Sequence, residues 1–532
     1  MHSFCRNELV PIEKGCIFLR QRRVLALLLL IVAVAVWPNF QAEAQAAGPL
    51  RVGLYYNSTA LPQVTVTGAN GLRLGWLQPE EEWPLELLIA PGQVSWLVRP
   101  ESPGYYRVAS NDLPDVAAAE ELRSLLDQAV LAWTGAHWQV WVGAATDASE
   151  ADALVSDLST LHPEQTWGVI SPDASRSELC TSSGQVLVVI PAGDIYLGAT
   201  DGGLMGLAGK QHRGWLQLTQ QSGRFRVINY IDVEDYLLGV VPREMSPGQP
   251  LEALKAQAVA SRSFALTCRK HQSYGFDVCA TTCCQAIDHS RESASTNQAV
   301  QETRGLVVTY NGQMIPVYCH ADAGGHTENP LYVWGSSMPY LTGVPELYPT
   351  DSTYASWEAR LPAAEIEQLL GQMNINVGDV LAVEALSYTP AGRVERLRIV
   401  GSATSTTLEK EQIRLNYHLK SRVYTVKPDI PAVSVLGASG QVTALNPSGL
   451  NVVTAAGPQT LQCTNAYYIL GSDGQQRQSS AQAASFLFTG SGFGHGVGIS
   501  QHGAYAMARN GHTFEEIIKY YLQGVEIVKL GD

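Results

Sequence analysis

The chain has 532 residues, which is enough for several domains because single domains usually hold about 50–200 residues. Its formal net charge of −14 argues against nucleic acid as a partner, since nucleic-acid binding needs basic surfaces that displace counterions from phosphates. A neutral or zwitterionic polymer is the better expected partner.

The first 44 residues have the pattern of a signal peptide. Basic residues at positions 20, 22 and 23 precede an apolar run over 24–36, and a small-residue pattern ends at Ala44. The run is shorter than the roughly 18–20 residues of a membrane-spanning helix, so cleavage after Ala44 is expected, with an uncleaved anchor as the alternative. The sequence therefore predicts a secreted or extracytoplasmic protein, either free or membrane-anchored by this segment.

The next two segments are expected to be β structure followed by a small β/α module. Segment 50–100 alternates apolar and polar residues between glycine turns, as antiparallel strands do. Segment 104–165 predicts strands at 105–109 and 138–143 and helices at 117–131 and about 150–158. This order resembles the SPOR domain, which binds glycan strands stripped of stem peptides. The alternative is an ordinary α/β insertion whose core contains Trp138 and Trp141.

The remaining chain completes an expected α+β, multi-domain fold. Region 185–430 begins with short strands, continues with a long helix over 251–269, and mixes a helix with hairpin strands over 366–426. Segment 431–484 is expected to be a small β insertion with linkers, and 485–530 returns to the main fold with a helix over 501–509.

Glu244 lies in the most informative stretch, on the expected connection before the long helix. The stretch reads DYLLGVVPREMSP over 235–247 and EALKAQAVASRS over 252–263. A lone glutamate in a loop is usually a solvated charge, so its position alone assigns no role. Apolar neighbours such as Met245 would raise its pKa by desolvation, whereas a nearby helix N-terminus would lower it.

Three further blocks follow in order, and together the four resemble the SpoIID/LytB family. They read DVCATTCCQ over 277–285, HADAGGHTE over 320–328 and GFGHGVGISQHGA over 492–504. The resemblance implies a catalytic core over 185–430 that is completed by 485–530 and by the N-terminal β segment. It also implies a lytic transglycosylase of peptidoglycan glycan strands, in which Glu244 is the catalytic acid and base.

The same motifs supply candidate substrate-binding residues, which are Arg262, His495, Ser500 and Gln501. Arg262 lies on the helix behind Glu244, and its alternative role is an ion pair that stabilises the fold. The other three lie on or after a glycine-rich loop that can pass close to a ligand. The alternative for this loop is that its glycines serve close packing and unusual backbone angles.

Cysteines suggest a structural zinc site, although catalysis itself is expected to need no cofactor. Cys279 and Cys284 match the cysteines of family relatives with a zinc site, and Cys283 stands where many have histidine. The ligand set could be completed by one of four histidines, which are His271, His289, His320 and His326. The competing interpretation for the remaining thiols is a disulfide, such as Cys268 with Cys319.

Two rival functions follow from this interpretation. The LytB branch includes non-enzymatic modifiers that enhance an amidase, and retention of Glu244 favours the enzyme instead. A zinc amidase is disfavoured because the chain lacks a His-Glu-x-x-His helix. The expected partners are glycan strands and other sporulation wall hydrolases such as an amidase.

Overall fold

The computed structural model describes residues 48–531 except 102–103, 430–432, 437–441, 446–450, 455–456, 461–466, 471–474 and 480–482. The predicted signal over 1–44 and Cys463 lie outside the described residues. Among the residues that are described, no helix has the length and apolar character needed to cross a membrane.

Two β-sheets pack face to face in the N-terminal half and confirm the expected β structure there. One sheet has the strand order β17 (Val278–Cys279), β1 (Leu50–Tyr55), β16 (Arg224–Ile231), β15 (Trp215–Gln221), β12 (Asp194–Ala199), β3 (Gly71–Trp76) and β4 (Leu85–Pro91). The other has the order β14 (Lys210–His212), β13 (Met205–Leu207), β2 (Val64–Gly68), β5 (Val94–Pro100), β10 (Ser177–Thr181), β11 (Val186–Ile190), β7 (Ala129–Trp133), β8 (Trp138–Ala145), β6 (Tyr106–Ala109) and β9 (Gly168–Ile170). Alternation in β2 buries Val64 and Val66 against residues such as Leu72 and Phe225 from the facing sheet.

The small module differs from its prediction in one element. Helix α1 (Val116–Ser124) begins at the Asp115 cap and stops at Ser124, so the prediction of a helix over 117–131 is wrong. Residues 129–133 instead form β7, whose branched and aromatic side chains suit a strand. Strand β7 also pairs in parallel with β11, which makes the module continuous with the ten-stranded sheet.

The strand and helix order of this module is βαββαβ. After β8 comes α2 (Ala148–Leu161), and the spatial strand order is β7-β8-β6-β9. Trp138 and Trp141 are buried, as expected for the ordinary α/β insertion. A wall-binding role for 104–165 stays a prediction from the sequence.

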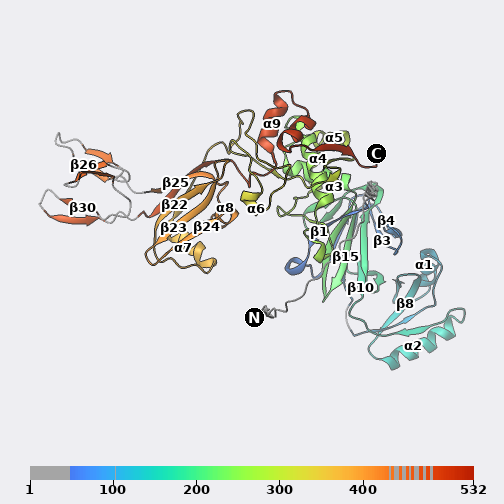
Figure 1. Ribbon diagram of the computed structural model, residues 1–532. Helices are drawn as coiled ribbons and strands as arrows, with labels where there is room; N and C mark the ends of the chain where they lie inside the picture. Colours follow the sequence, from blue (N-terminus) through green and yellow to red (C-terminus); the bar gives the residue numbers. More distant parts are fainter. Residues whose placement is uncertain are drawn as a thin grey trace, which may run out of the picture. The chain divides into compact units, whose positions relative to one another are not determined.

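A group of helices packs beside the seven-stranded sheet, around helix α4 (Leu251–Thr267) (Figure 1). Its neighbours are α3 (Val233–Glu244), α5 (Ala294–Glu302), α9 (Gln501–Arg509), α10 (Phe514–Tyr521) and strand β18 (Leu306–Tyr310), which pairs with β19 (Gln313–Met314) and β34 (Glu526–Lys529). Small buried residues such as Ala256 and Ala260 allow these elements to approach α4 closely. The α4 and α9 helices confirm the two helices predicted from the sequence, with α4 ending two residues early.

A buried ion pair fixes α3 against α4. The guanidinium of Arg262 donates from Nε to Glu234 Oε1 at 2.8 Å and from Nη2 to Oε2 at 2.7 Å. Its Nη1 donates to the carbonyl of Leu306, and Glu234 also accepts from the Gly305 amide. One charged pair therefore joins α3 and α4 to the start of β18.

A separate β module interrupts the predicted core, so the expectation of one continuous core over 185–430 is wrong. It consists of β21 (Trp357–Pro362), α7 (Ala363–Gln372), β22 (Val380–Tyr388), β23 (Val394–Gly401), β24 (Ser405–Glu409), α8 (Glu411–Asn416), β25 (Val423–Asp429) and β32 (Ser485–Ser491). Its two three-stranded sheets share a core that includes Leu397 and Phe488. The strands of the module alternate buried and exposed side chains. The buried side chains pack against one another in the module's own core and not in the core of the helical group.

The predicted β insertion at 431–484 emerges between β25 and β32. Its described residues form three hairpins: β26 (Val433–Leu436) with β27 (Val442–Leu445), β28 (Asn451–Thr454) with β29 (Gly457–Thr460), and β30 (Tyr467–Leu470) with β31 (Gln476–Ser479). The described part of the chain thus has the expected α+β class.

The substitution Glu234→Gln should lower the free energy of unfolding by about 3–5 kcal/mol, because it leaves the buried Arg262 guanidinium without its counter-charge. Denaturant unfolding measures this change. The control is Glu384→Gln, which removes an exposed partner of Arg398 and should change stability by less than about 0.5 kcal/mol. Equal effects of the two substitutions would contradict the assigned importance of the buried pair.

Candidate functional site

Glu244 is the last residue of α3 and lines a cleft of about 650 Å³. The expectation of a loop position is wrong, because α3 continues through Pro242 and turns into extended backbone only at Met245. The cleft walls come from α4, from β20 (Cys319–His320), from the short helix α6 (Leu331–Trp334) and from the glycine-rich loop. The structure therefore brings together motifs that are far apart in the sequence.

Burial raises the pKa of the half-buried Glu244 carboxyl above its ordinary value. A hydrogen bond from Gln501, the charge of Arg243 and the Ala286 amide act in the opposite direction. The carboxyl also lies at the C-terminal end of α3, where unpaired helix carbonyls disfavour an additional negative charge. Desolvation is the largest of these effects, so the site favours a protonated carboxyl.

A series of hydrogen-bonded polar side chains from α9 and α4 positions the Glu244 carboxyl. Gln501 Nε2 lies 3.5 Å from Glu244 Oε2 and 3.3 Å from Gln257 Oε1. Gln257 in turn donates to Ser261 Oγ at 3.0 Å. Gln501 is almost fully buried, so it contacts the candidate catalytic carboxyl and serves to position it. The sequence predicted Gln501 at the site but assigned it to substrate.

Two other predicted substrate-binding residues have structural roles. Arg262 is fully buried in its ion pair with Glu234, which is the alternative that the sequence left open. Ser500 is also fully buried, and its hydroxyl accepts from the Gly503 amide as the N-cap of α9. The prediction that Ser500 contacts substrate is wrong in this structure, because helix capping uses its hydroxyl and no surface of the residue is exposed.

His495 does line the cleft. Its ring lies 5.7 Å from that of His320 and 5.3 Å from that of Trp334, measured between centroids. Its Nδ1 accepts from the Val497 amide. Burial lowers the pKa of His495 to about 4, so the ring is neutral at ordinary pH.

The glycines of this loop serve close packing. Gly498 has a φ of +78°, and a Cβ there would lie 2.1 Å from the Tyr318 carbonyl oxygen. Gly496 has a φ of +86°, and a Cβ there would lie 2.4 Å from the buried Arg393 guanidinium. The loop that carries His495 into the cleft is therefore possible only without side chains at these positions.

The sequence reasoning missed several cleft residues, among them Trp334 and Arg414. Trp334 is 42% exposed and packs against Tyr318 with a centroid distance of 4.7 Å. An exposed tryptophan at the end of a four-residue helix leaves no periodic pattern in the sequence. Arg414 comes from α8 of the inserted module, and no local signal relates it to Glu244.

The cysteine motif forms a compact cluster, of which Cys283 and Cys284 line the same cleft. The donor atoms of His271, Cys279, Cys283 and Cys284 all lie within 4.8 Å of one another. The other predicted histidines are engaged elsewhere: His289 with the Asp235 carbonyl, His320 with the Val497 carbonyl and His326 with the Thr327 carbonyl. Of the four candidates, the structure selects His271.

The suggested disulfide between Cys268 and Cys319 is not formed. All six cysteines of the described chain are free thiols, and Cys268 forms a hydrogen bond with Cys284. Cys319 instead lines the cleft beside Glu244.

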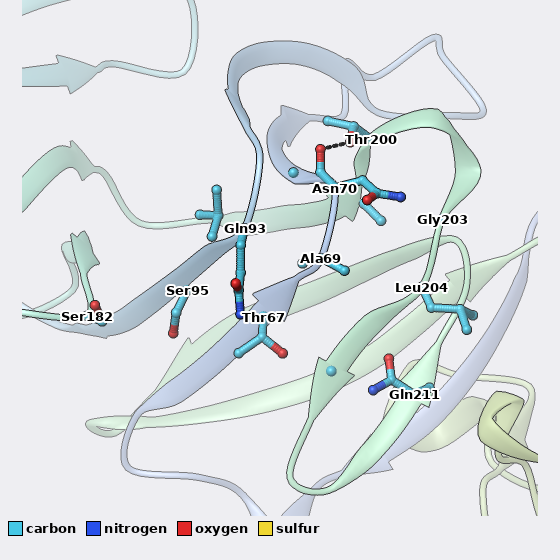
Figure 2. Close-up of a pocket in the computed structure, with 15 residues that line it drawn as sticks. Thr67, Ala69, Asn70, Gln93, Ser95, Ser182, Thr200, Gly203, Leu204 and Gln211 are labelled. Carbon is cyan, nitrogen blue, oxygen red and sulfur yellow. Dashed lines mark hydrogen bonds between the residues drawn. The ribbon is translucent and has the colours of Figure 1, made fainter.

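A second hollow of about 650 Å³ lies over the N-terminal sheets (Figure 2). Uncharged side chains such as Thr67, Gln93 and Gln211 surround it, and Thr200 Oγ1 donates to the Asn70 carbonyl at 3.0 Å. Its lining contains no acid, base or nucleophile of the kinds used in catalysis except hydroxyl groups. The Glu244 cleft is therefore the candidate active site.

The substitution Glu244→Gln should raise the melting temperature at pH 7. Because the folded-state pKa is raised, ionisation of Glu244 costs stability as the pH increases through that pKa, and a neutral amide avoids this cost. The gain should disappear below about pH 4, where the carboxyl is protonated in both folded and unfolded chains. Thermal melts at the two pH values measure the difference.

The control for this prediction is Glu302→Gln. Its carboxyl accepts from Lys255 and Gln298, and these bonds lower its pKa, so its removal should not raise the melting temperature at pH 7. A Glu244→Gln protein that melts lower than the unsubstituted protein at pH 7 would contradict the desolvation argument.

Comparisons with known proteins agree with the motifs at this cleft. Residues 221–310 match the family model SpoIID, described as Stage II sporulation protein, and residues 348–442 match a domain of unknown function, DUF8618. The first match contains Glu244, and the second covers most of the inserted β module.

Several relatives align with more than half of the chain. An uncharacterized protein of Brachyspira hyodysenteriae is 29% identical over 325 residues, covering 60% of this chain and 73% of the relative. Stage II sporulation protein D of Bacillus subtilis is 28% identical, covering 56% of this chain and 75% of that protein. The amidase enhancer of Bacillus subtilis is also 28% identical, but the aligned part spans only 40% of its length. Residues 221–310 therefore carry a SpoIID domain, and the chain is similar to stage II sporulation protein D over more than half of its length.

Proposed function

We propose that this protein is an exported, peptidoglycan-degrading enzyme that cleaves glycan strands as a lytic transglycosylase, with Glu244 as its acid and base. The observation that supports this proposal most strongly is the single carboxyl group of the cleft. Glu244 is half-buried, its pKa is raised, and no other acid occurs among the described residues that line the cleft.

One carboxyl group is sufficient for this reaction. Neutral Glu244 would donate its proton to the glycosidic oxygen that leaves C1 of N-acetylmuramic acid. The C6 hydroxyl of the same sugar then attacks C1, and the Glu244 carboxylate takes the hydroxyl proton. The products are a shortened strand and a 1,6-anhydro sugar, and no water is consumed. Hydrolases instead use a second carboxylate as nucleophile or to activate water.

The environment of Glu244 suits both halves of this cycle. Burial keeps the proton on the acid before reaction, and Gln501 stabilises the carboxylate that forms when the proton leaves. The neutral His495 and the exposed Trp334 contribute aromatic rings to the cleft lining. Such rings suit the apolar faces of sugar rings.

A role in sporulation is part of the proposal, because two relatives are named stage II sporulation protein D. Another relative is named amidase enhancer, which supports an alternative in which the protein binds wall and enhances an amidase without cleaving glycan itself. Either function requires export, in agreement with the signal pattern over 1–44.

A structural zinc ion held by His271, Cys279, Cys283 and Cys284 completes the proposal. Their mutual separation of at most 4.8 Å fits one tetrahedral ion, since zinc binds sulfur at about 2.3 Å and nitrogen at about 2.0 Å. A hydrogen bond from Cys284 lowers the pKa of the Cys279 thiol and so favours a thiolate there. Four protein ligands leave no position for substrate, so the ion would stabilise the fold.

The substitution Glu244→Gln should reduce glycan cleavage by about 10²–10⁴-fold, because an amide can neither donate nor accept the transferred proton. Mass spectrometry of strands stripped of stem peptides should detect anhydro ends with the unsubstituted protein and almost none with the variant. Activity should also fall on the alkaline side as Glu244 loses its proton.

Glu302→Gln is the matched control for cleavage, since it removes an exposed carboxyl outside the cleft. Comparable cleavage by the Glu244→Gln protein would refute the catalytic assignment. Absence of anhydro products from the unsubstituted protein, with stimulation of an added amidase, would instead support the modifier.

Removal of zinc should lower the melting temperature, because an ion that binds only the folded state stabilises that state. Cys279→Ser and Cys284→Ser should each lose bound zinc, as measured by elemental analysis. Cys180→Ser should retain it, since Cys180 lies in β10 of the ten-stranded sheet. Protein purified without chelator that contains no zinc, together with a mapped disulfide between Cys279 and Cys284, would refute the site.

A further inference from the structure

Positive charge is concentrated at the Glu244 cleft of an otherwise acidic protein. The formal net charge of the chain is −14, yet the cleft lining contains Arg269, Lys270 and Arg414 against the single acid Glu244. Lys270 is engaged with the cysteine cluster, since its Nζ lies 2.9 Å from Cys283 Sγ. The two arginines remain as cations that a ligand in the cleft can reach.

The two arginines come from different parts of the chain. Arg269 follows the end of α4, and its Nη1 donates to the carbonyls of Leu266 and Cys268. Arg414 lies on α8 of the inserted β module, and its Nε donates to Glu411 at 2.7 Å. Within the described part of the chain, the Nη groups of Arg414 have no hydrogen-bond partner, so they are free to bind a ligand.

Buried contacts hold the inserted module against the cleft. Arg393 is fully buried, and its Nη2 donates to the carbonyls of Ala323 and His326 in the motif over 320–328. The Gly494 amide of the glycine-rich loop donates to the Lys420 carbonyl of the module. The two bonds of Arg393 Nη2 favour this arrangement, because losing them would remove the carbonyl acceptors of a buried guanidinium.

A second buried arginine connects the module to the aromatic wall. Arg422 Nε donates to Glu411, the same carboxylate that holds Arg414, and its Nη2 donates to the Tyr332 carbonyl of α6. Helix α6 ends at Trp334. One hydrogen-bonded group therefore positions both the free guanidinium of Arg414 and the exposed ring of Trp334 at the cleft.

We propose that the inserted module, residues 357–429 with 485–491, forms one wall of the substrate cleft and that Arg414, together with Arg269, binds a carboxylate carried by the glycan. A guanidinium pairs with a carboxylate through two parallel hydrogen bonds, which gives direction as well as attraction. The lactyl group of muramic acid provides one such carboxylate in each disaccharide once the stem peptide has been removed. The identity of the polymer rests on the proposed function.

The proposal assigns the module a role in specificity. A carboxylate that is amidated or attached to a peptide carries no charge at this position and would lose the pairing with Arg414. When a free carboxylate pairs with Arg414, the sugar ring that carries it would lie against Trp334, whose exposed ring also lines the cleft.

Binding of glycan by the Glu244→Gln protein tests this proposal without interference from cleavage. Strands with free carboxylates should bind about 10-fold or more tightly than the same strands after methyl esterification, as expected for a charge-assisted pair. Adding Arg414→Gln should weaken binding to the free strands by a similar factor and leave binding to the esters unchanged. Arg269→Gln should act in the same direction.

The matched control is Arg398→Gln, which removes a charge from β23 of the same module outside the cleft lining. It should keep the full preference for free carboxylates. A preference for free carboxylates that survives Arg414→Gln unchanged would overturn the proposal.

Chemical protection gives a second measurement that needs no substitution in the module. A dicarbonyl reagent should modify Arg414 in the Glu244→Gln protein, and free-carboxylate strands should protect it whereas esterified strands should not. Equal protection by both would also overturn the proposal. Failure of the proposed function appears differently, as absence of anhydro products from the unsubstituted protein while carboxylate-dependent binding and protection persist.

Discussion

The burial of helix α4 is the constraint on which the rest of the structure depends. Residues along most of its length are inaccessible, and many are alanine or serine, so neighbouring elements approach its backbone closely. Arg262 fixes α3 and therefore Glu244, Gln257 contacts Gln501 of α9, and the C-terminal end of α4 leads to Arg269 and the cysteine cluster. One buried helix thus determines the positions of the carboxyl, its supporting amides and one of the cations.

Opposing electrostatic effects act on the pKa of Glu244 in this cleft. Desolvation and the C-terminal end of α3 disfavour a charged Glu244, whereas Gln501, Arg243 and the Ala286 amide favour it. A carboxyl under such a balance can hold a proton at one stage and exist as a carboxylate at the next, as an acid that later acts as a base must. The nearby arginines are partly used by the protein itself, since Arg414 pairs with Glu411. This pairing uses Nε of Arg414 and leaves its Nη groups as directed donors in the cleft lining.

The inserted module adds residues to the cleft lining, whereas the candidate catalytic carboxyl comes from α3. Its own hydrophobic core is separate from the helical group, yet Arg393 and Arg422 extend from it into carbonyl-rich loops around the cleft. Losing the carbonyl acceptors of a buried guanidinium costs free energy, so these bonds favour the observed docking geometry. Glycines at 496 and 498 make this possible, because a side chain at either position would collide with Arg393 or with the backbone of Tyr318.

The sequence by itself determined the features that depend on local pattern. The alternation of Val64 and Val66, the helices over 251–267 and 501–509, the family motifs and the cysteine cluster could all be predicted because nearby residues carry their signals. Burial and pairing were decided only by the tertiary structure. The sequence made Arg262 and Ser500 candidates for substrate binding, but packing buries them. It gave no signal for Trp334 and Arg414, which folding brings into the lining of the Glu244 cleft. The physical reason is that solvent exposure and partner distance are properties of long-range contacts, which no local spacing of residues encodes.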